Sequence, residues 1–431
     1  MRLLHTSDWH LGRSFHRVGL LQAQAAMLDH LVEVVRAERV DAVIVAGDVF
    51  DRALPAVDVV ALLDDALARL VATGASVILT SGNHDSARRL GFGARLLEQA
   101  RLHVRTDPAR LDDPVVLTDR HGPVAVYPLP YLEPALVAAG LNVVAQHEPV
   151  LRATVGAVRA DLAARPAATR SVVAAHAFVV GGQPSDSERD ISAGGVQAVP
   201  CGVFDGVDYV ALGHLHGRQR LTEQVRYSGS PLAYSFSEHA QVKGCWLVEL
   251  GAGGLERVDA VQTPVPRPLA ILRGRLSDLL ADAALARHGG AWCQVTLTDP
   301  QRPREPMQQL LTRFPHTLEL RFQPEAAPDA VVRSYTERVR GRDDVDLACG
   351  FLEHVRGRPA EQAEIGLLRQ AVVAGRLAQA EQLGAAPLPQ PQPPAGDAAE
   401  PDADADAVDA DAIDTPATGG VQQAQPLEDA G

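Results

Sequence analysis

The chain has 431 residues, enough for two or three domains with a sizeable core. Its net charge at pH 7 is −14, but ten of its acids lie in residues 386–431, where there is no Lys or Arg, so the acidic total does not exclude a local basic groove. The four cysteines are far apart and form no CxxC pair, which excludes a disulfide framework and a zinc knuckle. We find no membrane-spanning apolar run and no signal peptide, and we therefore expect a cytoplasmic protein that does not bind membranes.

The first 250 residues alternate short apolar runs with helical patterns, which predicts a layered α/β domain at 1–263. The expected strands are 2–5, 42–46, 75–80, 124–127, 171–175, 208–212, 225–227 and 244–250. The expected helices are 22–38, 57–72 and 147–165.

A smaller β-α-β-α-β pattern follows three prolines at 264, 266 and 268, which predicts a second domain at 266–323. Its expected strands are 269–274, 291–298 and 317–323, and its expected helices are 277–288 and 304–314. Residues 343–383 favour two helices, whose apolar side chains either dock on a partner or pack against their own chain. The tail at 385–431 is rich in Pro, Ala and Asp, and we expect it to be disordered because it cannot bury enough apolar surface to fold. It serves either as a spacer or as a mimic of DNA.

Polar clusters follow five of the expected strands. They are DWH at 8–10, GDVFDR at 47–52, GNHD at 82–85, AH at 175–176 and GHLH at 213–216. In α/β folds the carboxyl ends of strands are where sites form, so the five clusters together predict one site. The neighbouring glycines permit sharp turns and close approach of the backbone. We expect Asp8 and His10 to point the same way, as an i, i+2 pair at the end of a strand does.

The clusters contain seven donors of metal-binding type: carboxylates, imidazoles and one amide oxygen, without a thiolate. Such a set favours Mn²⁺, with Mg²⁺, Fe²⁺ and Zn²⁺ as alternatives. Seven donors are too many for one ion that keeps an open position, so we expect two ions that share a bridging carboxylate, and hydrolysis of a phosphoester. The donors are Asp8, His10, Asp48, Asn83, His176, His214 and His216.

The order of these motifs (DxH, GD, GNHD, a lone His, GHxH) resembles the calcineurin-like metallophosphoesterases. MRLLHTSDWHLGRSF, VDAVIVAGDVFDR, SDSERDI, DYVALGHLHGRQ and RYSGSPLAYSFSE resemble one branch, the bacterial SbcD nuclease subunits, nearly colinearly through about residue 265. The resemblance implies a layered β-sandwich flanked by helices, with a small α/β capping domain that governs access of DNA, a C-terminal helical segment and the acidic tail.

The resemblance also implies a role for each site residue. Metal one would take Asp8, His10, Asp48 and His216, and metal two would take Asp48, Asn83, His176 and His214. His84 would lie over the scissile phosphate and protonate the leaving oxygen without binding metal. Asp51 either orients His84 or pairs with Arg52, and Asp85 is expected to cap the turn.

The activity implied by the resemblance is that of an Mn²⁺-dependent double-strand exonuclease and single-strand or hairpin endonuclease in DNA repair, recombination and replication. Its partner would be SbcC, a coiled-coil ABC-type ATPase bound through residues 343–383, in a heterotetramer that contains two copies of this chain and lies at the nucleoid. ATP would act only through that partner, since this chain has no P-loop. The candidate DNA contacts are Arg13, His16, Arg17, Arg52, Arg88 and Arg89.

Two other functions fit the same motifs. A phosphomonoesterase or cyclic-nucleotide phosphodiesterase would use the same metal core, but it needs neither the second domain nor the apolar helices. A non-catalytic scaffold for the ATPase would need no complete set of donors.

Overall fold

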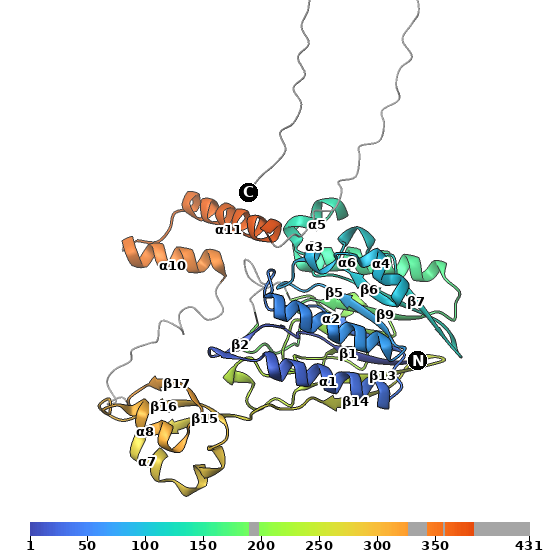
Figure 1. The fold of residues 1–431 in the computed structure, drawn as a ribbon. Coiled ribbons are helices and arrows are strands. Elements are labelled where there is room, and N and C mark those ends of the chain that lie inside the picture. The colour runs from blue at the N-terminus through green and yellow to red at the C-terminus, as the bar shows by residue number, and fades with distance from the viewer. Residues whose placement is uncertain (189–197, 326–342, 357, 383–431) are drawn as a thin grey trace, which may run out of the picture. The chain divides into compact units, whose positions relative to one another are not determined.

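Two six-stranded sheets form the N-terminal part of the computed structural model, which describes residues 1–188, 198–325, 343–356 and 358–382 (Figure 1). The first sheet consists, in spatial order, of β14 (Gly254–Gln262), β13 (Gly244–Gly251), β1 (Arg2–Thr6), β4 (Ala42–Ala46), β5 (Ser76–Thr80) and β6 (Leu102–Arg105). The second consists of β11 (Gln219–Arg220), β12 (Val225–Tyr227), β10 (Tyr209–Gly213), β9 (Arg170–His176), β8 (Gly122–Pro128) and β7 (Val115–Asp119).

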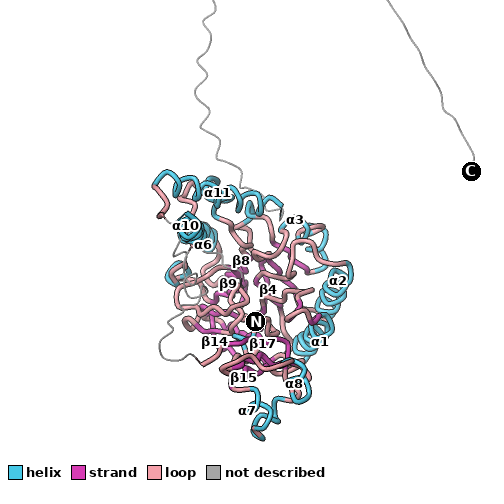
Figure 2. Tube along the Cα trace, turned by 90° about the vertical axis from the view of Figure 1, so that its left-hand side faces the viewer, coloured by secondary structure: helices cyan, strands magenta, loops and turns pink. Residues whose placement is uncertain are grey.

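Alternating side chains of the strands divide between an inner core and two outer ones. On β4, Ala42 and Ile44 join the cluster between the sheets, whereas Val43 and Val45 join the cluster under the helices. The helices α1 (Leu21–Ala37) and α2 (Val57–Ala72) cover the first sheet, and α5 (Pro134–Leu141) and α6 (His147–Ala164) cover the second. Figure 2 shows β4 and β9 between α1 and α2 on one side and α6 on the other. The predicted layered sandwich is confirmed.

In each sheet four consecutive strands run parallel to one another. This holds for β1, β4, β5 and β6 in the first sheet and for β8, β9, β10 and β12 in the second. The carboxyl ends of β1, β4 and β5 therefore lie at one edge of their sheet, and those of β9 and β10 at one edge of theirs. All five predicted polar clusters lie at the carboxyl ends of these five strands.

A three-stranded parallel sheet forms the second predicted module. It contains β15 (Leu269–Gly274), β16 (Trp292–Leu297) and β17 (Thr317–Phe322), with α7 (Leu276–Ala281), the 3₁₀ helix η5 (Ala283–His288) and α8 (Pro306–Arg313). The expectation of one continuous helix at 277–288 is wrong. The backbone is extended at Asp282, whose carboxylate accepts the N–H of Ala284 at 2.8 Å, so one helix ends there and the next begins.

Residues 343–383 contain the two predicted helices, α10 (Asp344–Arg356) and α11 (Gln362–Gln382). Leu377 of α11 packs against the core outside the second sheet, whereas Phe351 and Leu367 are exposed. Contacts with the same chain thus account for only part of their apolar surface. The predicted tail at 385–431 lies outside the described residues, as does most of the connection at 324–342.

The elements that the sequence analysis missed are edge strands, short helices and one apolar helix. β6, β7, β11 and β14 are the edge strands of the two sheets, and polar residues interrupt their apolar pattern. α5 is apolar on all sides and so shows no helical periodicity. No helix in the described ranges is long and apolar enough to cross a bilayer. The remaining short elements are β2 (Ser14–Phe15), β3 (Val18–Gly19), α3 (Ala87–Leu90), α4 (Ala94–Leu97), η1 (Glu98–Ala100), η2 (Pro108–Arg110), η3 (Cys201–Phe204) and η4 (Phe236–Glu238).

Candidate metal centre

The turns that carry the predicted donors have an unusual backbone. Asp8, His10 and Asp48 have φ values of 52°, 42° and 49°, and His214 has a φ of 107°. Left-handed conformations are costly for residues other than glycine and cluster at functional sites. The expected reason for the alignment of Asp8 and His10, an extended i, i+2 pair, is therefore wrong: both follow β1 in a left-handed backbone conformation. All seven donors are nevertheless buried.

One group of donors comes from the residues that follow β1, β4 and β10. The Nε2 atoms of His10 and His216 are 3.0 Å apart, and Asp48 Oδ2 lies 3.6 Å from His10 Nε2. Asp8 completes the group, because ligand atoms of Asp8, His10 and His216 lie within 4.8 Å of one another. These four residues are the ones expected at metal one.

A second group meets on the other side of Asp48. Its Oδ2 atom lies 3.4 Å from His176 Nε2, which is 2.9 Å from Asn83 Oδ1. The His214 ring lies 5.3 Å from the His176 ring, measured between centroids. The Asp48 carboxylate thus faces both groups, while its Oδ1 atom accepts the backbone N–H of His84 at 2.9 Å.

These contacts fit bound cations better than they fit a purely structural core. At most one proton can lie between the facing Nε2 atoms of His10 and His216, and a buried carboxylate is costly without a compensating charge. Nitrogen and oxygen donors without thiolate suit hard or borderline divalent ions. The Asp and His clusters are consistent with a dimetal site.

The charges in the metal-free protein interact strongly. Burial alone would raise the pKa of Asp48, but the imidazoles of His176 and His84 lower it well below its usual value. Burial lowers the pKa of His176, yet the Asp48 carboxylate outweighs it and raises that pKa to about 9. Burial, together with Asp48, raises the pKa of Asp8 to about 6, and burial lowers that of His10. Cations would have to displace a proton from His176 in order to bind it.

Two glycines leave no room for a side chain beside these donors. A Cβ atom on Gly82 would lie 2.1 Å from Asp48 Oδ1, and one on Gly213 would lie 1.9 Å from the carbonyl oxygen of Ala46. Both contacts are far too short for real atoms, so the backbones approach closely, as the glycines predicted.

His84 lies beside both Asp51 and the candidate ligands of metal one. Its Nδ1 atom is 2.9 Å from the carbonyl oxygen of Asp51, and its ring packs edge-on against His10 at 4.7 Å. Because a carbonyl can only accept, Nδ1 carries a proton. His84 also forms a group with His10 and Asp48 whose ligand atoms lie within 4.8 Å, so its position alone does not separate a ligand from a proton donor.

Asp51 contacts both of its predicted partners through different atoms. Its carbonyl meets His84, whereas its carboxylate lies 3.8 Å from Arg52, 3.5 Å from Arg13 and 3.7 Å from His10 Nδ1. The contact with His84 thus uses a backbone atom that any residue could supply.

Asp85 has a larger role than the expected local turn cap. Its buried carboxylate accepts N–H groups from Val49 at 3.0 Å, Phe50 at 2.9 Å and Gly82 at 2.9 Å. It therefore ties the loop of Asp48 to the loop of Asn83. In the sequence, only the GNHD motif pointed to Asp85. Its contacts with residues 49 and 50 could not be predicted, because they depend on the fold.

The candidate DNA contacts fall into two sets. Arg13 donates to the carbonyl of Ser187 at 2.9 Å and stacks on Tyr234 at 5.0 Å, and His16 lies 3.8 Å from Glu319 of β17. Both side chains are thus engaged within the protein. His16 is nevertheless exposed, as are Arg17, Arg52, Arg88 and Arg89.

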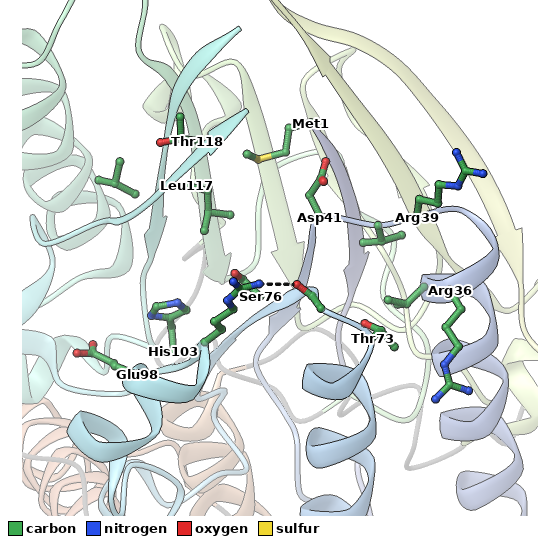
Figure 3. A pocket seen from close by; sticks show the side chains of 15 residues that line it. Met1, Arg36, Arg39, Asp41, Thr73, Ser76, Glu98, His103, Leu117 and Thr118 are labelled. Carbon is green, nitrogen blue, oxygen red and sulfur yellow. Dashed lines mark hydrogen bonds between the residues drawn. The ribbon is translucent and has the colours of Figure 1, made fainter. Parts of the chain in front are cut away.

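A separate open hollow of 720 Å³ lies at the amino ends of the parallel strands, away from every predicted donor. Arg36 and Arg39 line one side of it and His103 the other (Figure 3). Its charged groups do not converge on a common point, so we assign it no role in the site.

Two sequence-family models match the chain. The model described as calcineurin-like phosphoesterase matches residues 1–218. The chain belongs to this family. A second model, for the C-terminal domain of SbcD and described as type 5 capsule protein repressor C-terminal domain, matches residues 265–356. The chain is therefore an SbcD-like member of the family, as its motifs predicted.

Three solved structures are similar to this SbcD-like chain. Protein TT1561 of Thermus thermophilus is 13% identical over 61% of this chain and 98% of its own, with a TM-score of 0.36. A dimetal phosphatase from Danio rerio is 13% identical over 61% and 99%, with a TM-score of 0.34. GAP50, the anchor in the inner membrane complex of Plasmodium, is 12% identical over 77% and 99%, with a TM-score of 0.35. The family assignment rests on the two sequence models and not on these overall similarities.

Proposed function

We propose that the chain is a two-metal DNA nuclease, acting as an exonuclease on double strands and as an endonuclease on single strands and hairpins. The observation that carries the proposal is the convergence of buried donors on both sides of Asp48, in a chain that also has an SbcD-type C-terminal domain. A metal-dependent phosphoesterase is the part that the family membership establishes.

In this proposal Asp48 bridges two cations, with Mn²⁺ as the expected ion. Asp8, His10 and His216 hold the first together with Asp48, and Asn83, His176 and His214 hold the second. When bound, such a pair supplies an activated water and balances the charge that develops on the phosphate. Asn83 contributes a neutral oxygen and so adds no negative charge beside the substrate.

His84 is proposed to donate a proton to the leaving oxygen. The Asp51 carbonyl accepts its Nδ1–H, so Nε2 is the ring atom that would face a substrate and donate to it when the ring is doubly protonated.

The proposed substrate is DNA because the chain has a second folded module and two apolar helices, which an enzyme for a small substrate does not require. Trp292 of the three-stranded module stacks on Phe15 with ring centroids 5.2 Å apart, and Glu319 lies beside His16. The module thus contacts the loop that follows the DWH motif, where it could limit access to the metals. We propose 266–323 as this capping domain, and Arg17, Arg52, Arg88 and Arg89 as phosphate contacts.

Residues 343–383 are proposed to bind the coiled-coil base of an SbcC-type ATPase. The exposed side chains of Phe351, Leu367 and Val373 on α10 and α11 support this proposal. Deleting 343–383 should abolish recovery of the co-expressed ATPase in a pull-down, and unchanged recovery would reject the docking site.

The decisive assay for the substrate compares four compounds with the purified chain and Mn²⁺. They are a labelled DNA hairpin, linear duplex DNA, a cyclic nucleotide and p-nitrophenyl phosphate. The proposal predicts Mn²⁺-dependent cleavage of both DNAs, with and without the ATPase. Hydrolysis of only the small esters would favour the phosphatase alternative instead.

A further inference from the structure

Three polar groups of His216, its backbone N–H, its carbonyl and its ring Nδ1, are each held by a side chain from another part of the chain. Its backbone N–H donates to Glu188 at 2.7 Å, and its carbonyl accepts from Lys243 Nζ at 2.8 Å. Its ring Nδ1 lies 2.6 Å from Ser187 Oγ. The backbone and the ring of this one candidate ligand are thus both fixed in place.

Glu238 connects two of these contacts, those of Ser187 and Lys243. Its carboxylate accepts the hydroxyl of Ser187, accepts the N–H of Tyr234 at 3.3 Å and forms an ion pair with Lys243. The exposed fractions of Glu238 and Lys243 are only 1% and 6%. Lys243 also donates to Ser230 Oγ at 3.0 Å, so the ammonium group is held by several acceptors.

The direction of these hydrogen bonds determines which nitrogen of His216 is protonated. The Glu238 carboxylate can only accept, so Ser187 uses its proton toward Glu238 and accepts from His216 through a lone pair. The acceptor on Ser187 then requires a proton on His216 Nδ1. The lone pair of His216 is left on Nε2, the atom that faces His10.

A buried ion pair is weak evidence for stability, because desolvation offsets the attraction of the charges. Two apolar side chains would fill the same space. The pair nevertheless stands behind a candidate metal ligand, and Lys243 is the only lysine of the chain. The contacts of Lys243 therefore indicate that it fixes the position of His216.

We infer that Glu238 and Lys243 are positioning residues, which hold His216 in the orientation and tautomer that metal one requires. The inference rests on the metal centre of the proposed function. These side chains act on metal one alone. At metal two, Nδ1 of His176 lies 3.0 Å from the backbone carbonyl oxygen of Ala46, so that ring needs no such relay of side chains. Loss of partners of this kind typically weakens metal affinity about 10- to 100-fold.

Two variants of the full chain test the inference by calorimetry with Mn²⁺. Ser187→Ala cuts the relay without changing a charge, and Glu238→Gln/Lys243→Met removes both charges together, so no single buried charge is left unpaired. Each should weaken one Mn²⁺ about 10- to 100-fold and leave the other unchanged. Ser277→Ala and Glu223→Gln, on exposed residues away from the site, should leave both unchanged. Wild-type affinity at both sites in both test variants would overturn the inference, as would equal weakening of both sites.

A second readout needs no metal and so remains decisive even if two ions do not bind. Nitrogen-15 spectra of the histidine side chains in the metal-free protein should show the Nδ1–H form at His216, assigned with His216→Gln. That signal should shift or broaden in Ser187→Ala. A wild-type His216 in the Nε2–H form would refute the positioning role, whereas a wild-type Mn²⁺ stoichiometry below two would refute the proposed metal centre.

Discussion

Replacing His84 with glutamine separates the two roles that its position allows. The side chain lies close enough to His10 and Asp48 to share a cation with them, but its Nδ1–H is already directed to the Asp51 carbonyl. A glutamine amide can keep a hydrogen bond to that carbonyl while removing the ionisable ring. A proton donor contributes about 10²- to 10⁴-fold to a rate, or roughly 2.7 to 5.4 kcal/mol at 1.36 kcal/mol for each factor of ten.

The expected result for His84→Gln is two bound Mn²⁺ ions with near wild-type affinity and a rate of DNA cleavage that falls by this factor. Calorimetry gives the stoichiometry, and single-turnover cleavage of a labelled hairpin gives the rate. His30→Gln, on helix α1, is the matched control and should change neither. Loss of one Mn²⁺ in His84→Gln would show that His84 is a ligand and would refute the proposed role.

Three further perturbations test the surroundings of the metals. Asp85→Asn should lower the free energy of unfolding in urea by about 1–3 kcal/mol, because an amide cannot accept all three buried N–H groups; unchanged stability would contradict that bracing role. Asn83→Ala should weaken one Mn²⁺ and spare the other in calorimetry, and full occupancy of both would exclude Asn83 as a ligand. The affinity for Mn²⁺ should rise with pH between about pH 7 and 9, with release of a proton, since the raised pKa of His176, about 9, keeps it largely protonated across that range; a flat profile would argue against His176 as a ligand.

The sequence predicted the site better than it predicted the path of the backbone through it. Asp48, Asn83 and His176 could be placed together because each follows a parallel strand, and carboxyl ends of parallel strands meet. The left-handed turns at Asp8 and His10 could not be seen, since neither residue is a glycine. Their side chains converge because of these positive φ angles, which an extended-strand pattern does not predict.

Contacts between distant segments were also not predictable from the sequence. Glu238 ends the SFSE motif and Lys243 lies just before β13, yet both act on His216 more than twenty residues earlier. Alone, a Glu or a Lys at such positions has the pattern of an exposed residue. Asp85 likewise looked like part of a turn, because its acceptance of N–H groups from Val49 and Phe50 depends on how two loops meet.

The central claim is that two cations share Asp48, and anomalous diffraction from crystals grown with Mn²⁺ tests it directly. The account predicts two manganese peaks roughly 3.5–4 Å apart, one on each side of the Asp48 carboxylate. The first should contact His10 and His216, and the second Asn83 and His176. A single peak, or a peak with His84 among its ligands, would contradict the account.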